Sequence, residues 1–199
     1  MPPVRRGTDD DVASAAHVLA EAFAHDPVWG WAYPMAAAEP ERVAPVWALW
    51  VRSALAQGSL WVTEGCEAVA VRVAPDAAEL TDADAALFAP LTEELVGDRA
   101  QQVLAALDAF ETAHPTAPEH HYLSLLGTAN AHRGRGVGVA LLAAGLERID
   151  AEGAPAYLES TNPANDARYG RLGFQPRGTV TIPATGTVAT TMWRPPPER

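Results

Sequence analysis

The sequence contains no lysine, and all 14 of its basic residues are arginines. A phosphate-binding loop of the Gly-Lys-Ser/Thr type is therefore excluded, because it needs a lysine beside the phosphates. Self-acetylation on lysine is excluded for the same reason. The chain has one cysteine, Cys66, so it forms neither an intramolecular disulfide nor a cysteine-rich metal site. The spacing of histidine and carboxylate residues resembles no metal site either, and we expect no metal.

Long apolar segments are also missing. No run of about 18 uncharged apolar residues is present, and residues 1–11 lack the apolar stretch of a signal peptide. Basic residues are outnumbered, since 25 acidic residues face the 14 arginines and give a formal net charge of -11. Such a surface repels phosphate backbones and anionic lipid. We expect a cytoplasmic protein that binds neither nucleic acid nor membranes.

What is present is the composition of a folded domain. The chain has 199 residues, of which 48% are hydrophobic and 20% charged, and this length fits one domain. Periodic apolar spacing predicts helices, and alternating spacing predicts strands. We expect helices over 12–23, 39–57, 83–113 (broken near Pro90 and Gly97), 139–151 and 163–172, and strands over 4–6, 59–64, 68–73, 121–126, 156–160, 174–176 and 188–193. This alternation predicts an α/β (or α+β) fold with a mixed sheet flanked by helices.

A glycine-rich turn stands between a strand and a helix. Residues 132–142 read His-Arg-Gly-Arg-Gly-Val-Gly-Val-Ala-Leu-Leu. Glycines allow successive amide groups to point at one spot, and the helix N-terminus adds positive charge, so the turn can hold a phosphate. A dinucleotide-binding turn would lie near the first strand and would have a glycine at position 141. Two readings stay open on these residues: a site for the pyrophosphate of coenzyme A, or a flexible loop without a ligand.

A second block follows at the expected distance. Residues 157–174 contain a strand, Asn165, Tyr169 four residues later, and a Leu-Gly-Phe ending. Together the two blocks resemble the acetyl-CoA signature of the GNAT superfamily of N-acetyltransferases, from about residue 4 to 194. The segments Asp10–Val12, Ala100–Gln102 and Tyr157–Ser160 are similar to puromycin N-acetyltransferase-like members of that family.

The resemblance implies a central, mostly antiparallel sheet whose fourth and fifth strands splay apart to admit the pantetheine arm of acetyl-CoA. It implies one domain over 1–194, with a helical insert near 83–113 and a proline-rich tail over 195–199. The residues that it assigns to acetyl-CoA binding are Leu126, Gly127, Thr128, Arg133, Gly134, Arg135, Gly136, Val137, Gly138, Val139, Asn165 and Tyr169.

Acetyl transfer to an amine needs an acid for the leaving thiolate and a base for the amine. The resemblance makes Tyr169 the general acid, because a phenol with a pKa of about 10 can return a proton to a thiolate of similar basicity. The base stays open between His120, Glu159 acting through water, and the position of Tyr122, where several relatives carry theirs. Strand alternation places His120, Tyr122 and Ser124 on one face, with His121, Leu123 and Leu125 on the other. A solvated histidine and a salt-bridged carboxylate are the alternatives.

The acceptor site is expected in the aromatic loop that follows the first helix. Asp26, Trp29, Trp31 and Tyr33 in this loop would suit a planar or cationic amine. We therefore expect a monomeric or homodimeric enzyme that moves an acetyl group directly from acetyl-CoA to a small-molecule amine, such as an antibiotic or toxic amine. The alternatives are acetylation of peptide or protein N-termini, a non-catalytic module that binds coenzyme A, and a nucleotide-binding protein.

Overall fold

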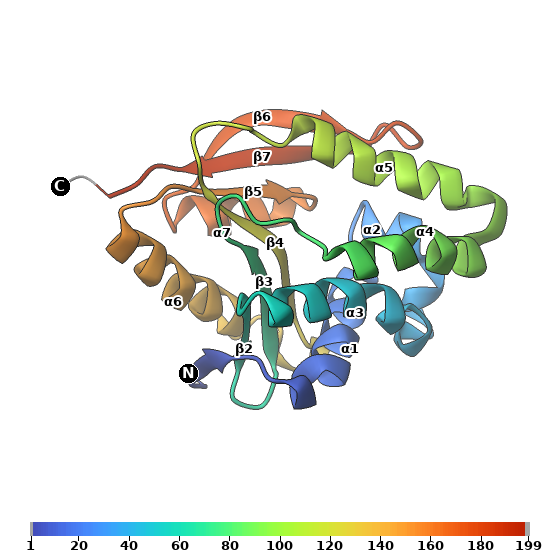
Figure 1. Cartoon of the computed structure of the whole chain (residues 1–199), viewed down its shortest axis with the longest axis horizontal. Coiled ribbons are helices and arrows are strands. Elements are labelled where there is room, and N and C mark those ends of the chain that lie inside the picture. Colours follow the sequence, from blue (N-terminus) through green and yellow to red (C-terminus); the bar gives the residue numbers. More distant parts are fainter. Residues whose placement is uncertain (1, 198–199) are drawn as a thin grey trace.

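A single mixed sheet organises the fold. In the computed structural model, which describes residues 2–197, seven strands follow the order β1-β2-β3-β4-β5-β7-β6 (Figure 1). The strands are β1 (Val4–Arg6), β2 (Leu60–Thr63), β3 (Ala68–Val73), β4 (His121–Thr128), β5 (Ala156–Ser160), β6 (Gln175–Thr181) and β7 (Val188–Arg194). Neighbours are antiparallel, except that β4 and β5 are parallel. The expected fold class is confirmed.

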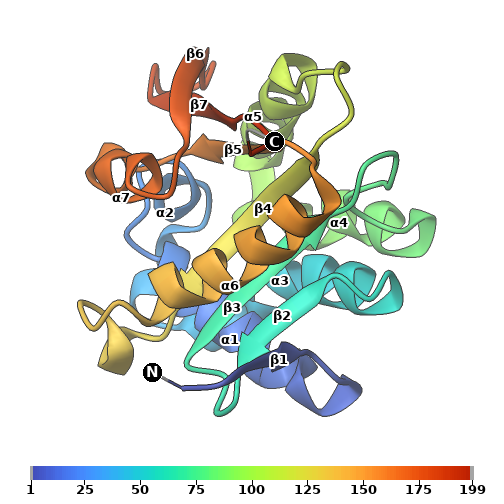
Figure 2. The same ribbon diagram turned by 90° about the vertical axis from the view of Figure 1, so that its left-hand side faces the viewer.

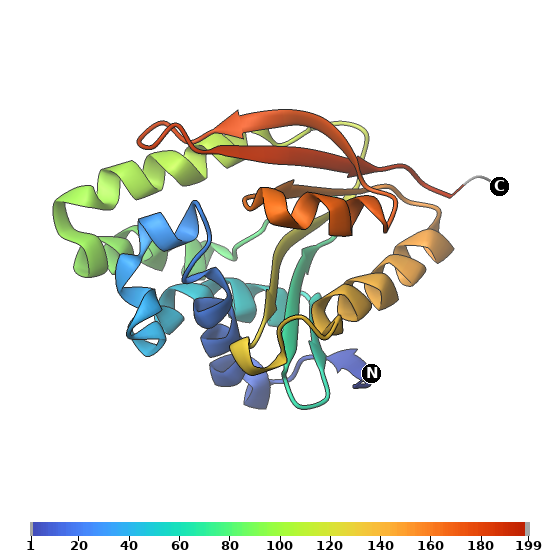
Figure 3. The same ribbon diagram turned by 180° about the vertical axis from the view of Figure 1, so that it is seen from behind.

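Helices cover both faces of this sheet. They are α1 (Val12–Phe23), α2 (Trp29–Ala32), α3 (Pro40–Ala56), α4 (Asp82–Val96), α5 (Ala100–Ala113), α6 (Val137–Glu152) and α7 (Asp166–Gly170). Helix α6 packs on one face, whereas α1 and α3 pack on the opposite face (Figures 2 and 3). Among the described residues, no helix combines the length and the apolar character that crossing a membrane requires.

Strand β3 contributes to two separate cores. Val69 and Val71 pack with α1 and α3, whereas Ala68 and Ala70 pack under α6. Successive side chains of a strand point to opposite faces, so a central strand covered on both sides is apolar throughout. This explains why the helices of both layers are held in place by the same short segment.

A β-bulge interrupts β4 at Ser124. Leu125 pairs with Val71 and Leu123 pairs with Arg72, so Ser124 has no partner on β3. An extra residue of this kind shifts the alternation of side chains by one position. Leu123 consequently packs under α6, whereas Leu125 joins the core on the side of α1 and α3. The expectation that Leu123 and Leu125 share a face was therefore wrong.

Beyond the bulge, β4 separates from β5. Only two residue pairs join them in the described structure, His121 with Ala156 and Tyr122 with Tyr157. The rest of β4, up to Thr128, and the rest of β5, up to Ser160, have no such pairing with each other. The fourth and fifth strands therefore diverge from the level of Tyr122, which confirms the expected splay.

The segment expected as helices over 83–113 forms α4 and α5, which connect β3 to β4. Pro90 does not break α4, contrary to expectation. It lies on the exposed side, where the carbonyl group of Ala86, left without an amide donor, can bond water. The chain turns instead at Gly97, whose φ of +54° suits glycine.

Other boundaries differ from the expectations. The aromatic loop contains a helical turn, α2, because Oδ1 of Asp26 accepts hydrogen bonds from the amides of Val28 and Trp29. Strand β6 extends over 175–181 instead of 174–176, and its mostly exposed side chains explain why alternation did not reveal it. Of the expected tail, residues 198–199 lie outside the described residues, as does residue 1 of the expected domain.

Candidate active site

The glycine-rich turn leads into the N-terminus of α6, beside the open part of β4. Gly134 and Gly136 have φ values of +75° and +76°, which other residues rarely adopt. A Cβ atom on Gly138 would lie 2.5 Å from Oγ1 of Thr128, so the helix approaches β4 closely only because that residue is glycine. The first amide groups of a helix have no partner within it and attract anions. This geometry can hold a phosphate group.

The two arginines of the turn have different roles. The guanidinium group of Arg133 donates a 2.6 Å hydrogen bond to the carbonyl oxygen of Ala22 at the end of α1. Arg133 therefore fastens the turn to α1, so its charge is partly engaged by a helix C-terminus. Arg135 is exposed. Arg133 is exposed as well, but its guanidinium group is held by α1, so Arg135 is the arginine of this turn that we expect to meet an anionic ligand.

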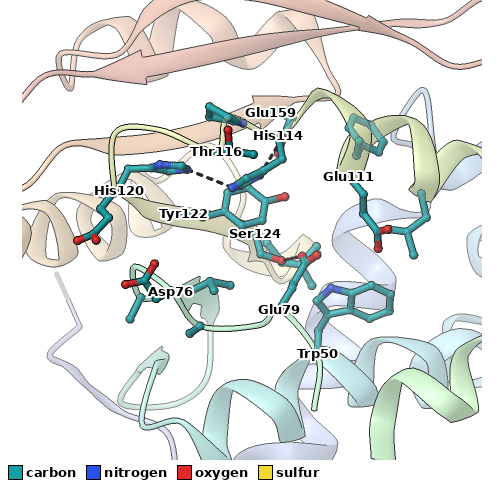
Figure 4. A pocket seen from close by; sticks show the side chains of 18 of the residues that line it. Trp50, Asp76, Glu79, Glu111, His114, Thr116, His120, Tyr122, Ser124 and Glu159 are labelled. Carbon is teal, nitrogen blue, oxygen red and sulfur yellow. Dashed lines mark hydrogen bonds and ion pairs between the residues drawn. The ribbon is translucent and has the colours of Figure 1, made fainter. Parts of the chain in front are cut away.

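A cavity of about 430 Å³ opens on the α3 and α5 side of the splayed strands (Figure 4). Its walls come from β4, β5, the C-terminal half of α5, the segment before β4 and the loop between β3 and α4, with Trp29 of α2 and Trp50 of α3. Ser124 and Leu125 line it from the part of β4 that does not pair with β5, and Glu159 lines it from the part of β5 that does not pair with β4. The cavity thus lies where the two strands begin to diverge.

The lining of this cavity is acidic. The carboxylate residues that contribute to it are Asp76, Glu79, Glu111, Glu119 and Glu159. No arginine is among the described lining residues, and the chain has no lysine. A cavity bounded by carboxylates and low-dielectric walls concentrates cations.

Two histidines and Glu159 form a chain along one wall. Nε2 of His114 lies 3.1 Å from Nε2 of His120, and Nδ1 of His114 lies 3.7 Å from Oε1 of Glu159 (Figure 4). The ring of His114 contacts the rings of Tyr122 and Tyr157 edge to face, with centroids 4.7 and 4.9 Å apart. The tyrosines therefore fix the plane of the His114 ring.

Glu159 is enclosed by these neighbours. Its side chain is 4% exposed, and its Oε1 atom has no hydrogen-bond partner in the described structure. Burial raises the pKa of Tyr122 and of Tyr157, and the adjacent Glu159 carboxylate raises both further. Both phenols therefore keep their protons at neutral pH.

Glu79 lies on the opposite wall, in the loop between β3 and α4. Its Oε1 atom accepts a hydrogen bond from the hydroxyl group of Ser124, the residue at the bulge (Figure 4). Burial raises the pKa of Glu79, with Ser124 acting in the opposite direction. The bulge therefore turns a polar side chain toward a second carboxylate.

The residues expected to bind the acceptor separate into two groups. Trp29 lines the cavity and packs against Trp47. Tyr33 is 1% exposed, and its hydroxyl group pairs with Thr92 at 2.9 Å, in the core between helices. Trp31 contacts the guanidinium group of Arg99. Neither Tyr33 nor Trp31 belongs to the cavity lining, so the structure does not bring them to the site.

Asp26 supports the cavity wall instead of facing an open space. Its Oδ2 atom accepts a hydrogen bond from Thr161, which lines the cavity, and its Oδ1 atom holds the first amides of α2. Burial raises the pKa of Asp26. Both carboxylate oxygens of Asp26 thus accept hydrogen bonds from the protein itself.

Tyr169 lies on α7, close to Asp26. Burial raises the pKa of Tyr169 to about 12, and the carboxylates of Asp26 and Asp166 add to this effect. The phenol therefore holds a proton that it can donate. Oδ1 of Asn165, one helical turn earlier, accepts a hydrogen bond from Arg168.

A comparison with known families decides the class of the protein. Residues 63–174, more than half of the chain, match the model of the Acetyltransferase (GNAT) family. The chain belongs to this family. Enzymes of the GNAT family are acyltransferases with acetyl-CoA as cosubstrate, and both sequence blocks that suggested the family lie within or at the edge of the matched range.

Solved structures agree with the GNAT fold. A protein from Corynebacterium glutamicum, described as histone acetyltransferase HPA2 and related acetyltransferase, has a TM-score of 0.69 and 27% identity over 100% of this chain and 98% of its own. The polyamine N-acetyltransferase of Drosophila melanogaster has a TM-score of 0.61 and 19% identity over 97% of this chain and 99% of its own. An agmatine N-acetyltransferase has a TM-score of 0.61 and 18% identity over 96% of this chain and 97% of its own. The last two likenesses show a common fold.

Sequence reasoning missed two residues of this GNAT cavity. His114 follows α5 and Glu79 lies in the loop before α4, and both positions lack a local motif. His114 is followed by Pro115, which ends the helix at the cavity. That helix-ending dipeptide is the one sequence signal that could have drawn attention to it.

Proposed function

We propose that this protein transfers the acetyl group of acetyl-CoA directly to the amine of a small molecule in a ternary complex. One observation carries the proposal: the part of β4 that does not pair with β5 begins at the acidic cavity, which Ser124 lines, and ends at Thr128, which the N-terminus of α6 approaches at Gly138. A thioester lying between the strands would meet an amine that enters from the cavity.

The glycine turn fits the pyrophosphate of acetyl-CoA. Amide groups at residues 133–139 would hold the phosphates, with the side chain of Arg135 adding charge. Backbone groups of Leu126 and Thr128, which lie on the part of β4 that does not pair with β5, would bond the pantetheine arm, with Gly127 between them, and Asn165 would contact it from the opposite side. Holding two reactants in alignment lowers the activation barrier by several kcal/mol, and by about 7–11 kcal/mol in the best intramolecular cases.

Tyr169 would donate the proton that the leaving thiolate needs. Its raised pKa, about 12, keeps the phenol protonated through the neutral range. A positioned acid of this kind contributes about 10²–10⁴-fold to a rate.

The acceptor would be a cationic small amine. The support is the acidic lining, since carboxylates such as Glu79 and Glu159 attract an ammonium group. Two structural neighbours are named for agmatine and polyamines, which are also cationic amines. The puromycin-like resemblance adds antibiotic amines, and hence a role in resistance, to the candidates. Residues 1–194 would form one domain, with a helical insert near 83–113 that contributes to the cavity wall.

The test is thiol release from acetyl-CoA with a panel of puromycin, aminoglycosides, polyamines and short peptides. We expect turnover with a small cationic amine. Double-reciprocal plots of the initial rate at several acetyl-CoA concentrations should give intersecting lines, as a ternary complex requires. Tyr169→Phe should lose about 10²-fold or more in kcat and still bind acetyl-CoA in calorimetry. Parallel lines in these double-reciprocal plots would contradict direct transfer. Turnover with peptides alone would favour N-terminal acetylation, and acetyl-CoA binding without any turnover would favour a non-catalytic module.

A further inference from the structure

The histidine pair in the cavity fixes the positions of its own protons. Nδ1 of His120 lies 2.8 Å from the carbonyl oxygen of Pro118. A carbonyl oxygen only accepts hydrogen bonds, so Nδ1 must carry the hydrogen. Burial is the largest effect and lowers the pKa of His120; the hydrogen bond to the Pro118 carbonyl and the Glu159 carboxylate oppose this, whereas the charge of Arg177 adds to it. His120 is therefore neutral, with a free lone pair on Nε2.

This assignment determines the tautomer of His114. The Nε2 atoms of the two rings are 3.1 Å apart, and one of them must donate. Because Nε2 of His120 has no hydrogen, Nε2 of His114 donates. A neutral His114 then has its lone pair on Nδ1, the atom that lies 3.7 Å from Oε1 of Glu159.

Two proton acceptors thus face each other at the cavity wall. Nδ1 of His114 carries a lone pair, and Oε1 of Glu159 has no donor at normal hydrogen-bond distance among residues 2–197, although the hydroxyl groups of Tyr122 and Tyr157 lie near this carboxylate. Both residues line the cavity. An ammonium group has several N–H bonds and a positive charge, so it can donate one hydrogen bond to each of the two atoms.

We propose that Nδ1 of His114 is the general base that accepts a proton from the acceptor's ammonium group, while the Glu159 carboxylate holds that group in place. The inference rests on the proposed function and names the residue that starts the reaction. His120 is a positioning residue, because its Nε2 atom is occupied by His114 and is not free to take the proton. Tyr122 holds its own proton and serves as a wall of the His114 ring.

The proton balance is complete. One N–H bond of the ammonium ion breaks as the Nδ1–H bond forms, which leaves a neutral amine and a His114 imidazolium beside the Glu159 carboxylate. The amine lone pair forms the C–N bond while the C–S bond breaks. The thiolate takes the phenolic proton of Tyr169, and the second proton that leaves this nitrogen passes through water to the Tyr169 phenolate and restores the phenol. The side chain of His114 is 32% exposed, so it can release its proton to water.

Several ionisable groups surround His114. These groups are Glu159 and Tyr157 on β5, Tyr122 on β4 and His120 just before it, Glu79 in the loop before α4, Glu111 on α5, the helix that His114 follows, and Arg177 on β6, which acts on His120 and Tyr157. Three of them are carboxylates, so a cationic acceptor meets an acidic environment beside this ring.

The tautomers can be tested without any activity measurement. Nitrogen-15 NMR of the whole protein, labelled at histidine, should show neutral His120 as the Nδ1–H tautomer and neutral His114 as the Nε2–H tautomer. His114→Gln and His120→Gln would assign the signals. A neutral His114 that carries its hydrogen on Nδ1 would overturn the proposal.

Kinetics provide the second test. His114→Gln keeps a donor near the position of Nε2 but has no base, so kcat should fall about 10²–10⁴-fold with an unchanged Kd for acetyl-CoA. The acid limb of the kcat profile should disappear in this variant. His120→Asn should reduce kcat less, keep the acid limb, and show a mixture of His114 tautomers. His17→Gln, on the exposed side of α1, is the matched control and should behave as wild type.

The outcomes separate this proposal from the proposed function. Wild-type turnover in His114→Gln would overturn the role of His114 and leave the acetyltransferase assignment intact. Absence of turnover in the wild-type protein with every amine would overturn both. If His114→Gln fails to fold, as circular dichroism would reveal, the tautomer of wild-type His114 still decides the matter.

Discussion

The hydroxyl group of Thr161 donates a 2.6 Å hydrogen bond to Oδ2 of Asp26 and so joins the end of β5 to the loop after α1. Oδ1 of the same carboxylate holds the amides of Val28 and Trp29 at 2.9 and 3.1 Å. Asp26 is 8% exposed, and burial raises its pKa. One carboxylate therefore positions Trp29 in the cavity wall and stands beside Tyr169.

Thr161→Val should weaken both the fold and acceptor binding. The variant leaves a buried carboxylate oxygen without its donor, which costs about 1–3 kcal/mol, and releases the cavity wall, which raises the acceptor KM. The pKa of Asp26 is already above 3.8 and should rise further, so the loss of stability should grow as pH increases from about 4 toward 7. Urea unfolding at several pH values measures this effect. Thr161→Ser keeps the hydroxyl group and should match the wild type, whereas equal losses in both variants would contradict the argument.

Glu79→Gln should separate stability from function. Burial raises the pKa of Glu79, so its ionised form costs stability at neutral pH, and the amide should leave the unfolding free energy unchanged or larger. The KM for a cationic acceptor should increase about 10–100-fold, because a charge-assisted contact of about 1.5–3 kcal/mol is lost. Steady-state kinetics with acceptors of different charge checks this. Asp76→Asn, an exposed lining residue, should change KM little. Equal effects of the two variants would show that only the overall charge of the cavity matters.

The order of helices and strands could be predicted because it rests on local patterns. Apolar residues spaced along 12–23 predicted α1 with its observed limits, and the strand, glycine turn and helix around Gly136 are a contiguous signal. The family followed from two such blocks. The splay of β4 from β5 came from the resemblance, and the pairing of just Tyr122 and His121 with β5 bears it out.

The cavity could not be predicted in the same way. His114 and Glu79 are 35 positions apart in the chain and meet only because α4 and α5 fold back over the sheet. The bulge at Ser124 is equally invisible, since an inserted residue shifts the side-chain alternation without changing the composition of the strand. Neighbours in the sequence can also face different ways in the fold. Tyr33 and Trp29 were expected together in the acceptor site, but Tyr33 belongs to the core and Trp29 to the cavity.

Asp11→Asn should lower the stability of the protein at neutral pH. The guanidinium group of Arg5 forms two hydrogen bonds with the Asp11 carboxylate, at 2.7 and 2.8 Å, and these hold the pKa of Asp11 well below 3.8. A depressed pKa means that the stabilisation is present above about pH 4 and is lost as pH falls through the folded-state value. We expect a loss of about 1–3 kcal/mol at pH 7 and a smaller one near pH 3, measured by urea unfolding. Asp10→Asn, its exposed neighbour, is the control. A pH-independent loss would contradict the role of the ion pair.

Gly138→Ala should reduce acetyl-CoA affinity through a single steric contact. The new methyl group would lie 2.5 Å from Oγ1 of Thr128, so α6 must move away from β4 and carry its N-terminal amides with it. We expect the Kd for acetyl-CoA to increase about tenfold or more in calorimetry, because hydrogen bonds to charged groups contribute about 1.5–3 kcal/mol. Adding Thr128→Ala removes the atom in conflict while keeping the β4 backbone, and this double variant should recover affinity relative to Gly138→Ala. Thr128→Ala alone should bind like the wild type. If the double variant binds no better than Gly138→Ala, the close approach of α6 to β4 is not what positions the glycine turn.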